Sequence, residues 1–133
     1  MAFFATISNN IEHLGANQDI VFDHAITNVG NAYNGHHGTF IAPSAGIYMF
    51  STTLVHPWQH AKSWGHFMVN GNIVAKLVVS DFPSSQTIIV SLKQGDDVSV
   101  QNTASDRDFN GDRYSSFCGF LLYEDFPMPS VVG

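Results

Sequence analysis

The segment from residue 22 to residue 52 places aromatic residues and glycine at fixed intervals, with almost no charge between them. Within it, the run Gly46-Ile47-Tyr48-Met49-Phe50 sets two large rings two residues apart. Side chains at spacing two lie on one face of a β-strand, whereas a helix needs apolar residues three and four apart. The helical pattern is absent between Pro43 and Phe50, so the spacing predicts an extended strand with one buried face.

The same period-two pattern, interrupted by turn residues, predicts about nine or ten short strands and no helix. The expected strands cover residues 2–8, 19–23, 38–42, 47–55, 64–69, 72–80, 86–92, 97–102 and 115–124. Asn70-Gly71 separates two of them and suits a type I′ hairpin turn, in which both central residues have positive φ. Strands at this regular spacing predict an all-β sandwich or barrel.

One domain accounts for the 133 residues, with a short proline-containing tail from about residue 126. A chain of this length can bury a core of its own without covalent staples. Cys118 is the single cysteine, so no intrachain disulfide is expected. Its apolar neighbours predict a small buried side chain rather than a reactive thiol.

The formal charge of −6, with only five Lys and Arg, argues against general binding to nucleic acid or to anionic lipid. No apolar run approaches the roughly 18 residues of a membrane-spanning helix, and no signal peptide is visible at the start of the chain. The sequence also contains no Gly-x-Ser-x-Gly elbow, phosphate loop or His-Glu-x-x-His motif. We therefore do not expect an enzyme, a nucleic-acid-binding protein or an inserted membrane protein.

The marked positions of the first segment resemble the signature of the globular heads of complement C1q, the C1q/tumour-necrosis-factor-like family. The signature runs Phe, five residues, Asn or Asp, four, an aromatic, six, Phe, five, then Gly-x-Tyr-x-Phe-x-aromatic. Seven positions match it, and an eighth, Thr52, stands where the family has Phe or Tyr; the matching residues are Phe22, Asn28, Tyr33, Phe40, Gly46, Tyr48 and Phe50. The stretches 92–100 and 116–122 resemble the family's Gly-Asp turn and closing strand, so the resemblance covers the whole chain.

The resemblance implies a ten-stranded, two-sheet jelly-roll sandwich that assembles as a homotrimer. Stand-alone heads of this kind resemble secreted, extracellular innate-immune proteins that recognise microbial polysaccharide as lectins. The alternative is a trimeric signalling or extracellular-matrix ligand for a protein receptor. With 44% apolar and 12% charged residues, an apolar surface covered by subunit contact is also expected. The signature residues are core and turn positions, so they indicate the fold and not the ligand.

The segment 55–66 carries three His and two Trp and is the strongest candidate for ligand binding. Trp can stack on the apolar face of a sugar ring, while His and Gln can hydrogen-bond its hydroxyls. The candidate ligand-binding residues are His56, Trp58, Gln59, His60, Trp64, His66 and Asp81. Two alternatives stay open. Trp64 and His66 share a strand face, so at least one of them could be a packing residue. His56 and His60 could hold a metal ion, but only if the chain between them formed a helical turn.

The loop from residue 106 to residue 112 begins like an EF-hand calcium loop. Its candidate metal ligands are Asp106, Asp108, Asn110 and Asp112. The match fails at the twelfth position, where Phe117 replaces the required Glu. Calcium is therefore a possible cofactor, and a solvated acidic loop is the alternative.

Strand parity connects these two candidate regions. In an antiparallel sandwich every second connection emerges at the same end, so residues 55–63, 81–85 and 103–114 should be neighbours. We call these three segments the rim. The sequence predicts a composite binding site there.

Overall fold

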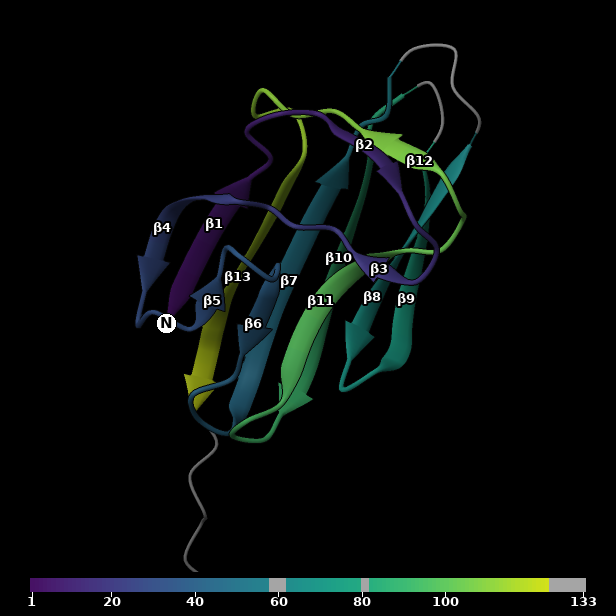
Figure 1. The fold of residues 1–133 in the computed structure, drawn as a ribbon. Helices are drawn as coiled ribbons and strands as arrows, with labels where there is room; N and C mark the ends of the chain where they lie inside the picture. The colour runs from purple at the N-terminus through teal and green to yellow at the C-terminus, as the bar shows by residue number, and fades with distance from the viewer. Residues whose placement is uncertain (58–61, 80–81, 125–133) are drawn as a thin grey trace, which may run out of the picture.

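The computed structural model describes residues 1–57, 62–79 and 82–124. It shows two antiparallel β-sheets packed face to face, with no helix in these ranges (Figure 1). None of the described residues belongs to a helix long and apolar enough to cross a membrane. The strands are β1 (Ala2–Thr6), β2 (Ile11–Leu14), β3 (Gln18–Asp19), β4 (His24–Val29), β5 (Tyr33–Asn34), β6 (Thr39–Ile41), β7 (Gly46–Leu54), β8 (Ser63–Val69), β9 (Asn72–Val79), β10 (Ser84–Leu92), β11 (Asp97–Asn102), β12 (Arg107–Phe109) and β13 (Ser116–Glu124).

One sheet has the order β10-β7-β13-β1-β4, and the other has the order β5-β6-β11-β8-β9, with β3 paired to β11. Strands β2 and β12 pair with each other outside both sheets and lie across one end of the sandwich (Figure 1). We call this pair the strap. The predicted two-sheet antiparallel jelly roll is confirmed.

The strand count and some boundaries differ from the sequence prediction. The structure has short strands β2, β5 and β12, which contain only two to four residues and so show no period-two pattern. The expected strand 19–23 is wrong in most of its length, because only its first residue pairs in a ladder, as part of β3. Strand β4 was missed because it is an edge strand exposed along nearly its whole length, so burial does not alternate.

The long central strand β7 explains the spacing of the signature. Its residues alternate strictly between buried and partly exposed, with Tyr48 and Phe50 on the buried face. Thr52 shares that face and is also buried, and its hydroxyl donates to the Ser116 carbonyl of β13 at 2.9 Å. The departure from the family signature is therefore accommodated, because the buried hydroxyl has a hydrogen-bond partner.

The core is a cluster of aromatic rings contributed by both sheets. Phe3 of β1 stacks on Tyr33 of β5 with a centroid distance of 4.5 Å and meets Phe117 of β13 edge-on at 4.9 Å. Phe40 of β6 meets Phe50 of β7 at 5.2 Å in a T-shaped contact. Rings in these offset and edge-to-face arrangements add attraction beyond the apolar area that they bury. The cluster therefore joins the two layers.

A close approach and a turn explain two of the glycine positions. A Cβ on Gly46 would lie 2.5 Å from the Tyr123 carbonyl oxygen, so the signature glycine lets β7 pass close to β13. In the β8–β9 hairpin, Asn70 and Gly71 have φ values of 50° and 78°. Both angles are positive, so the predicted type I′ turn geometry is confirmed.

Cys118 differs from its prediction in burial. It lies on β13 and is half-buried rather than fully buried. Burial raises the pKa of its thiol, and a hydrogen bond from the Ser51 backbone opposes the shift only in part. A raised pKa disfavours the reactive thiolate, as expected for a packing cysteine.

Candidate functional site

Strand β7 ends, and strands β10 and β13 begin, at one end of the sandwich (Figure 1). Strand β10 begins beside the end of β7. The Arg107 Nε–H donates to the Lys62 carbonyl at 3.0 Å, and the Asn110 N–H donates to the Val55 carbonyl at 2.7 Å. The described residues of the three rim segments are therefore neighbours, as strand parity predicted.

Four of the predicted ligand-binding residues, Trp58, Gln59, His60 and Asp81, lie outside the described residues. His56 is described and is only 4% exposed. Its Nδ1 lies 2.7 Å from the Pro57 carbonyl oxygen, which can only accept, so Nδ1 is the donor. Its Nε2 is buried without a hydrogen-bond partner. This geometry gives His56 a packing role at the end of β7.

Trp64 and His66 lie on the outer face of β8. The Trp64 side chain is 40% exposed, and Val78 of β9 is its cross-strand neighbour. His66 pairs with Lys76 on one side and with Gln101 of β11 on the other. Partial burial, with a smaller contribution from Lys76, lowers the pKa of His66. At neutral pH the imidazole is therefore uncharged and can both donate and accept a hydrogen bond.

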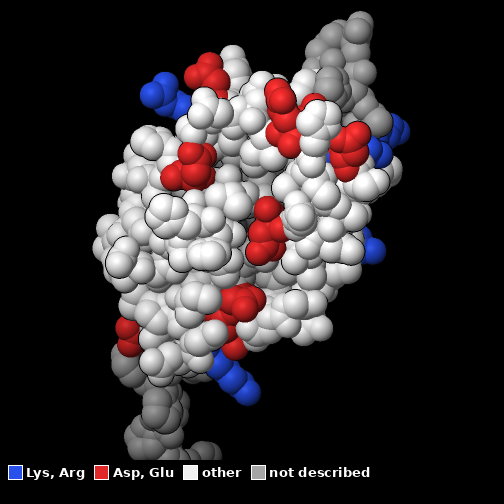
Figure 2. Space-filling view, in the orientation of Figure 1, with Lys and Arg blue, Asp and Glu red and all other residues white. Residues whose placement is uncertain are grey.

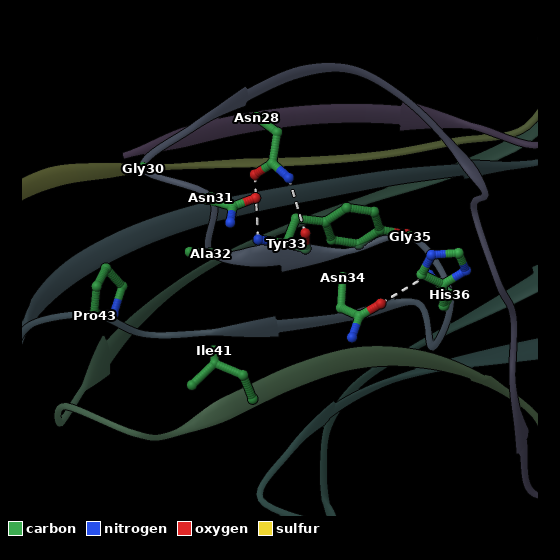
Figure 3. Close-up of a pocket in the computed structure, with 10 residues that line it drawn as sticks. All are labelled: Asn28, Gly30, Asn31, Ala32, Tyr33, Asn34, Gly35, His36, Ile41 and Pro43. Carbon is green, nitrogen blue, oxygen red and sulfur yellow. Dashed lines mark hydrogen bonds between the residues drawn. The ribbon is translucent and has the colours of Figure 1, made fainter.

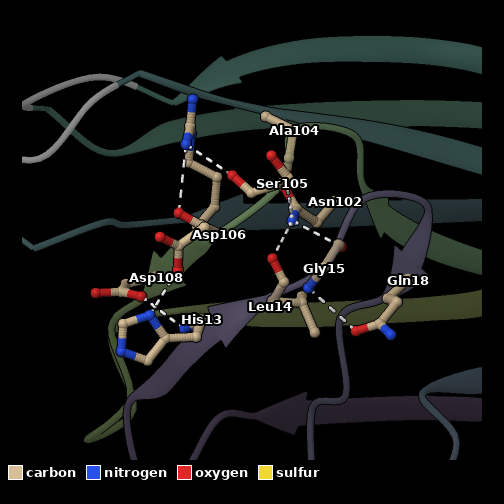
Figure 4. Close-up of polar contacts among 10 residues, drawn as sticks. His13, Leu14, Gly15, Gln18, Asn102, Ala104, Ser105, Asp106 and Asp108 are labelled. Atoms are coloured by element: carbon tan, nitrogen blue, oxygen red, sulfur yellow. Dashed lines mark hydrogen bonds and ion pairs between the residues drawn. The ribbon is translucent and has the colours of Figure 1, made fainter.

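The acidic loop is organised around His13 rather than around a shared cation position (Figure 4). The Asp106 Oδ1 lies 2.5 Å from His13 Nδ1, and the Asp108 Oδ1 accepts from the His13 N–H at 2.8 Å. The N–H groups of Asn110 and Asp112 donate to backbone carbonyls of the segments at 55 and 8, respectively.

Among the described residues, no group of three or more His, Cys, Asp or Glu side chains is arranged to hold a metal ion. The acidic loop therefore contributes carboxylates to the strap, and calcium binding stays a prediction that rests on sequence alone.

Asn102, at the end of β11, links the strap and the acidic loop to the sheet. The sequence did not indicate this role. Its side-chain amide is buried and donates to the carbonyls of Leu14 and Gly15 at 3.1 Å and of Ala104 at 2.7 Å (Figure 4). One side chain therefore holds the strap and the following loop to the sheet. The sequence around Asn102 does not predict this role, because all three acceptors are backbone carbonyls. Two of them lie 87 and 88 residues away along the chain.

A cleft of about 690 Å³ lies beside β5, and three asparagine side chains help to line it (Figure 3). It is lined by Asn28, Asn31, Asn34 and His36 among others, and none of its lining residues is Asp, Glu, Lys or Arg. We call it the amide cleft. It lies away from the rim, because Ile41, on its wall, pairs with the first residue of β11 and not with the last.

The amide cleft also shows why Asn28 and Tyr33 belong to the signature. The Asn28 amide donates to the Tyr33 carbonyl at 2.9 Å and accepts from its N–H at 3.3 Å (Figure 3). The Tyr33 hydroxyl donates to the Phe22 carbonyl at 2.7 Å, and burial raises its pKa so that it keeps its proton. Hydrogen bonds therefore join the three signature residues Phe22, Asn28 and Tyr33 to one another.

The sequence matches the C1q domain family over residues 2–122. The chain belongs to this family. The human and mouse proteins named complement C1q tumor necrosis factor-related protein 3 are each 28% identical to it over 129 residues. These matches cover 93% of this chain and 52% of each relative, so the C1q chain described here spans about half the length of the curated relatives it matches.

Solved structures of similar shape come from both the complement and the tumour necrosis factor groups. The globular domain of zebrafish complement 1qA has a TM-score of 0.69 at 17% identity, covering 93% of this chain and 98% of that one. Eiger TNF from S. frugiperda has a TM-score of 0.72 at 14% identity, covering 99% and 98%. Murine APRIL has a TM-score of 0.70 at 12% identity, covering 90% and 96%. At these identities the similarity establishes the jelly-roll fold of the C1q domain and no more.

Proposed function

We propose that this C1q domain is a secreted recognition protein of innate immunity that binds carbohydrate on microbial surfaces through the rim and the adjoining face of β8. The observation that carries the proposal is the exposed Trp64 ring beside His66 and Gln101. An exposed indole offers an apolar face for a sugar ring, and the neighbouring imidazole and amide can bond its hydroxyls. No catalytic role is proposed.

Charge narrows the ligand class. The protein carries a formal charge of −6, which repels polyanions at neutral pH. The uncharged state of His66 suits hydroxyl groups better than carboxylate or phosphate. We therefore expect neutral polysaccharides to bind better than sulfated or phosphorylated ones.

Assembly as a homotrimer is the second part of the proposal. Strand register places Val29, Ala2, Phe120, Met49 and Ile89 in one row across the outer face of the five-stranded sheet. Val29, Phe120 and Ile89 are exposed in the single chain. An apolar row of this kind, running across a whole sheet, supports coverage by another subunit. A strictly monomeric mass at micromolar concentration would contradict it.

A trimeric signalling or matrix ligand that binds a protein receptor is the second candidate. Strand β9 exposes Ile73, Val74 and Val78, and Val78 is the cross-strand neighbour of Trp64 on β8. Exposed apolar side chains on an edge strand can serve a protein interface as well as a sugar platform, and here Lys76 separates Val78 from the other two. The similarity to Eiger TNF and APRIL in fold is consistent with this candidate.

A glycan array, read with and without calcium and alongside a mass measurement in solution, tests the two candidates. We expect neutral glycans to bind the assembled wild-type protein, Trp64→Ala to lose most of that binding, and Trp64→Phe to keep part of it. Ile41→Ala, which removes an exposed apolar side chain from the outer face of the same sheet, is the matched control.

The outcomes test separately where glycan binds and whether the protein binds glycan at all. Glycan binding that survives Trp64→Ala but is lost in Asn34→Ala would move the site to the amide cleft and contradict the rim. An assembled protein that binds no glycan would refute the lectin and favour the receptor ligand. Binding that requires calcium would support the metal prediction, and binding that ignores EDTA would contradict it.

A further inference from the structure

A second cleft, of about 270 Å³, lies between the end of β1, the strap strand β2 and the segment 19–23. Its floor is aliphatic, formed by Ile7, Ile11, Leu14 and Val21. Two carboxylates, those of Asp19 and Asp23, lie on its wall. We call it the Asp19 cleft. It is distinct from the rim and from the amide cleft, and the proposed function does not use it.

The two carboxylates are placed by an alternating segment. Residues 20 and 22 are fully buried, whereas Asp19, Val21 and Asp23 reach the surface. Residues at spacing two share a face, so a carboxylate stands on each side of the Val21 side chain. The segment therefore presents an acid, an aliphatic group and an acid in a line along the cleft.

The two carboxylates differ in their partners. Asp23 accepts from the Ser8 N–H at 2.9 Å and from the Ser8 hydroxyl. Burial alone would raise the pKa of Asp23, but these hydrogen bonds, its own backbone N–H and nearby His24 together lower it, so it stays ionised. Asp19 has an oxygen that is shielded from solvent and accepts no hydrogen bond. A carboxylate in this position lacks part of the compensation that a buried charge needs.

No cation within the described part of the chain supplies that compensation. The ion pair found there joins His13 to Asp106, and none of the residues that line the Asp19 cleft is Lys, Arg or His. On the face where β3, β5 and β6 lie, acidic side chains are spread from one end to the other, and Lys and Arg lie at the edge (Figure 2). This face therefore attracts positive charge, and the cleft offers it an aliphatic floor.

We propose that the Asp19 cleft receives an arginine side chain from a protein partner. Arginine buries its methylene stem along apolar surface while its guanidinium seeks a carboxylate. The guanidinium is more weakly hydrated than an ammonium group and forms paired hydrogen bonds with carboxylates, so it suits a partly buried acid better than lysine does. In this arrangement the stem lies over Leu14 and Val21 and the guanidinium pairs with Asp19. Asp23 contributes a second negative charge.

Binding of N-acetyl-arginine amide, followed in two-dimensional ¹H–¹⁵N spectra of the whole chain, tests the proposal. We expect saturable shifts at the amides of Ser8, Asn9 and Val21, and none with N-acetyl-citrulline amide, which has the same stem without the charge. This pair of probes needs no mutation, so the result does not depend on the folding of a variant. Equal shifts with the two probes, or shifts spread over the acidic face, would overturn the proposal.

Substitution of each carboxylate compares how much Asp19 and Asp23 contribute to binding of the arginine probe. Asp19→Asn should weaken binding of the arginine probe by roughly ten-fold, and Asp23→Asn by roughly three-fold, because the guanidinium bonds directly to the first and only feels the charge of the second. Glu12→Gln is the matched control, since it removes one negative charge from β2 without touching the cleft and should change nothing. Unchanged binding in Asp19→Asn would overturn the proposal.

A third probe distinguishes a protein side chain from a small cation. Putrescine carries the same kind of aliphatic stem between two ammonium groups. If it saturates the cleft more tightly than the blocked arginine, the site takes free polyamines and the partner proposal is wrong. Weaker binding of putrescine, together with loss of the arginine probe at high salt, would support it.

Discussion

The aromatic interior and the strap both join segments that are far apart in the sequence, but they do so with opposite chemistry. Phe117 lies within 6.2 Å, centroid to centroid, of the rings of five other residues and has no exposed surface. His13 and Asp106 meet through a single contact, and about three quarters of each side chain is exposed. The first region should therefore set stability regardless of pH, and the second should add a small contribution that depends on protonation.

Backbone geometry reinforces the difference. Strand β7 forms a nine-residue ladder with β10 without a register shift. In the strap, the pairing of β12 with β2 is irregular, and His13 and Asp106 both have positive φ, at 58° and 55°. Left-handed backbone conformations raise the free energy of residues other than glycine, and they occur where side-chain or ligand contacts offset that increase. The strap is thus held by specific contacts, whereas the sheets are held by regular pairing and packing.

Phe117→Ala should give the largest effect. Removing a fully buried ring leaves a cavity among its ring neighbours, so we expect a loss of about 3–5 kcal/mol in the free energy of unfolding. Urea denaturation at fixed protein concentration measures it. Phe82→Ala, which removes an aromatic ring that is 73% exposed, is the control and should cost much less. Similar losses in the two variants would remove the distinction between interior and surface.

Gly119→Ala should come next. A Cβ at this position would lie 2.3 Å from the Phe50 Cδ1, so the ring must move and the core becomes overpacked, at a cost of about 1–3 kcal/mol. Phe50→Ala removes the clashing ring atoms, so the double variant should lose less than the sum of the two single losses. Additive losses in the unfolding experiment would show that the close approach of β13 to β7 does not limit residue 119.

Asn28→Ala tests the hydrogen bonds between Asn28 and Tyr33 at the edge of the interior. It deletes both side-chain hydrogen bonds to the Tyr33 backbone in a partly buried setting, so we expect a loss of about 1–2 kcal/mol. Thr27→Ala, at an exposed neighbouring position, is the control. Thermal unfolding at several heating rates would measure both, and a loss no larger than that of the control would count against a structural role for this signature residue.

The smallest effect should come from His13→Gln, and it should depend on pH. The hydrogen bond to Asp106 and its charge, with a smaller contribution from Asp108, raise the pKa of His13 above 6.5 in the folded protein. A raised folded pKa stabilises the protein fully below the unfolded value and loses that effect as pH rises through the folded value. The variant should therefore be less stable than wild type near about pH 5.5 and nearly equal near about pH 8.5.

His37→Gln is the matched control for this measurement, since it replaces an exposed histidine without a carboxylate partner in the described structure. Its stability relative to wild type should not change across the same pH interval. If the His13 and His37 variants show the same pH dependence, the contact between His13 and Asp106 makes no contribution in solution.

Much of the interior could be predicted from sequence because its information is local. The alternation along β7 and the Asn70-Gly71 turn depend on residues a few positions apart, and both predictions were correct. Strand β4 and the short strands were missed because neither exposure on both faces nor a length of two to four residues leaves a period in the sequence. Strand parity correctly placed the rim segments together, since it depends only on strand order and direction.

The sites depend on contacts that no local pattern encodes. His56 and Trp64 belong to the same histidine- and tryptophan-rich segment, yet one is buried and the other is exposed. The acidic loop resembled a cation site, but Asp106 and Asp108 turn toward His13, which is more than ninety residues away. The Asp19 cleft likewise requires β1, β2 and the segment 19–23 to meet.

The sequence by itself determined the all-β sandwich and the family, because a strand's buried face repeats every two residues and the signature marks those faces directly. Only the tertiary structure decided which polar groups meet, which histidine is buried and where the clefts lie. The physical reason is that side-chain direction along a strand is fixed locally, whereas the partner of a polar side chain depends on how distant segments pack.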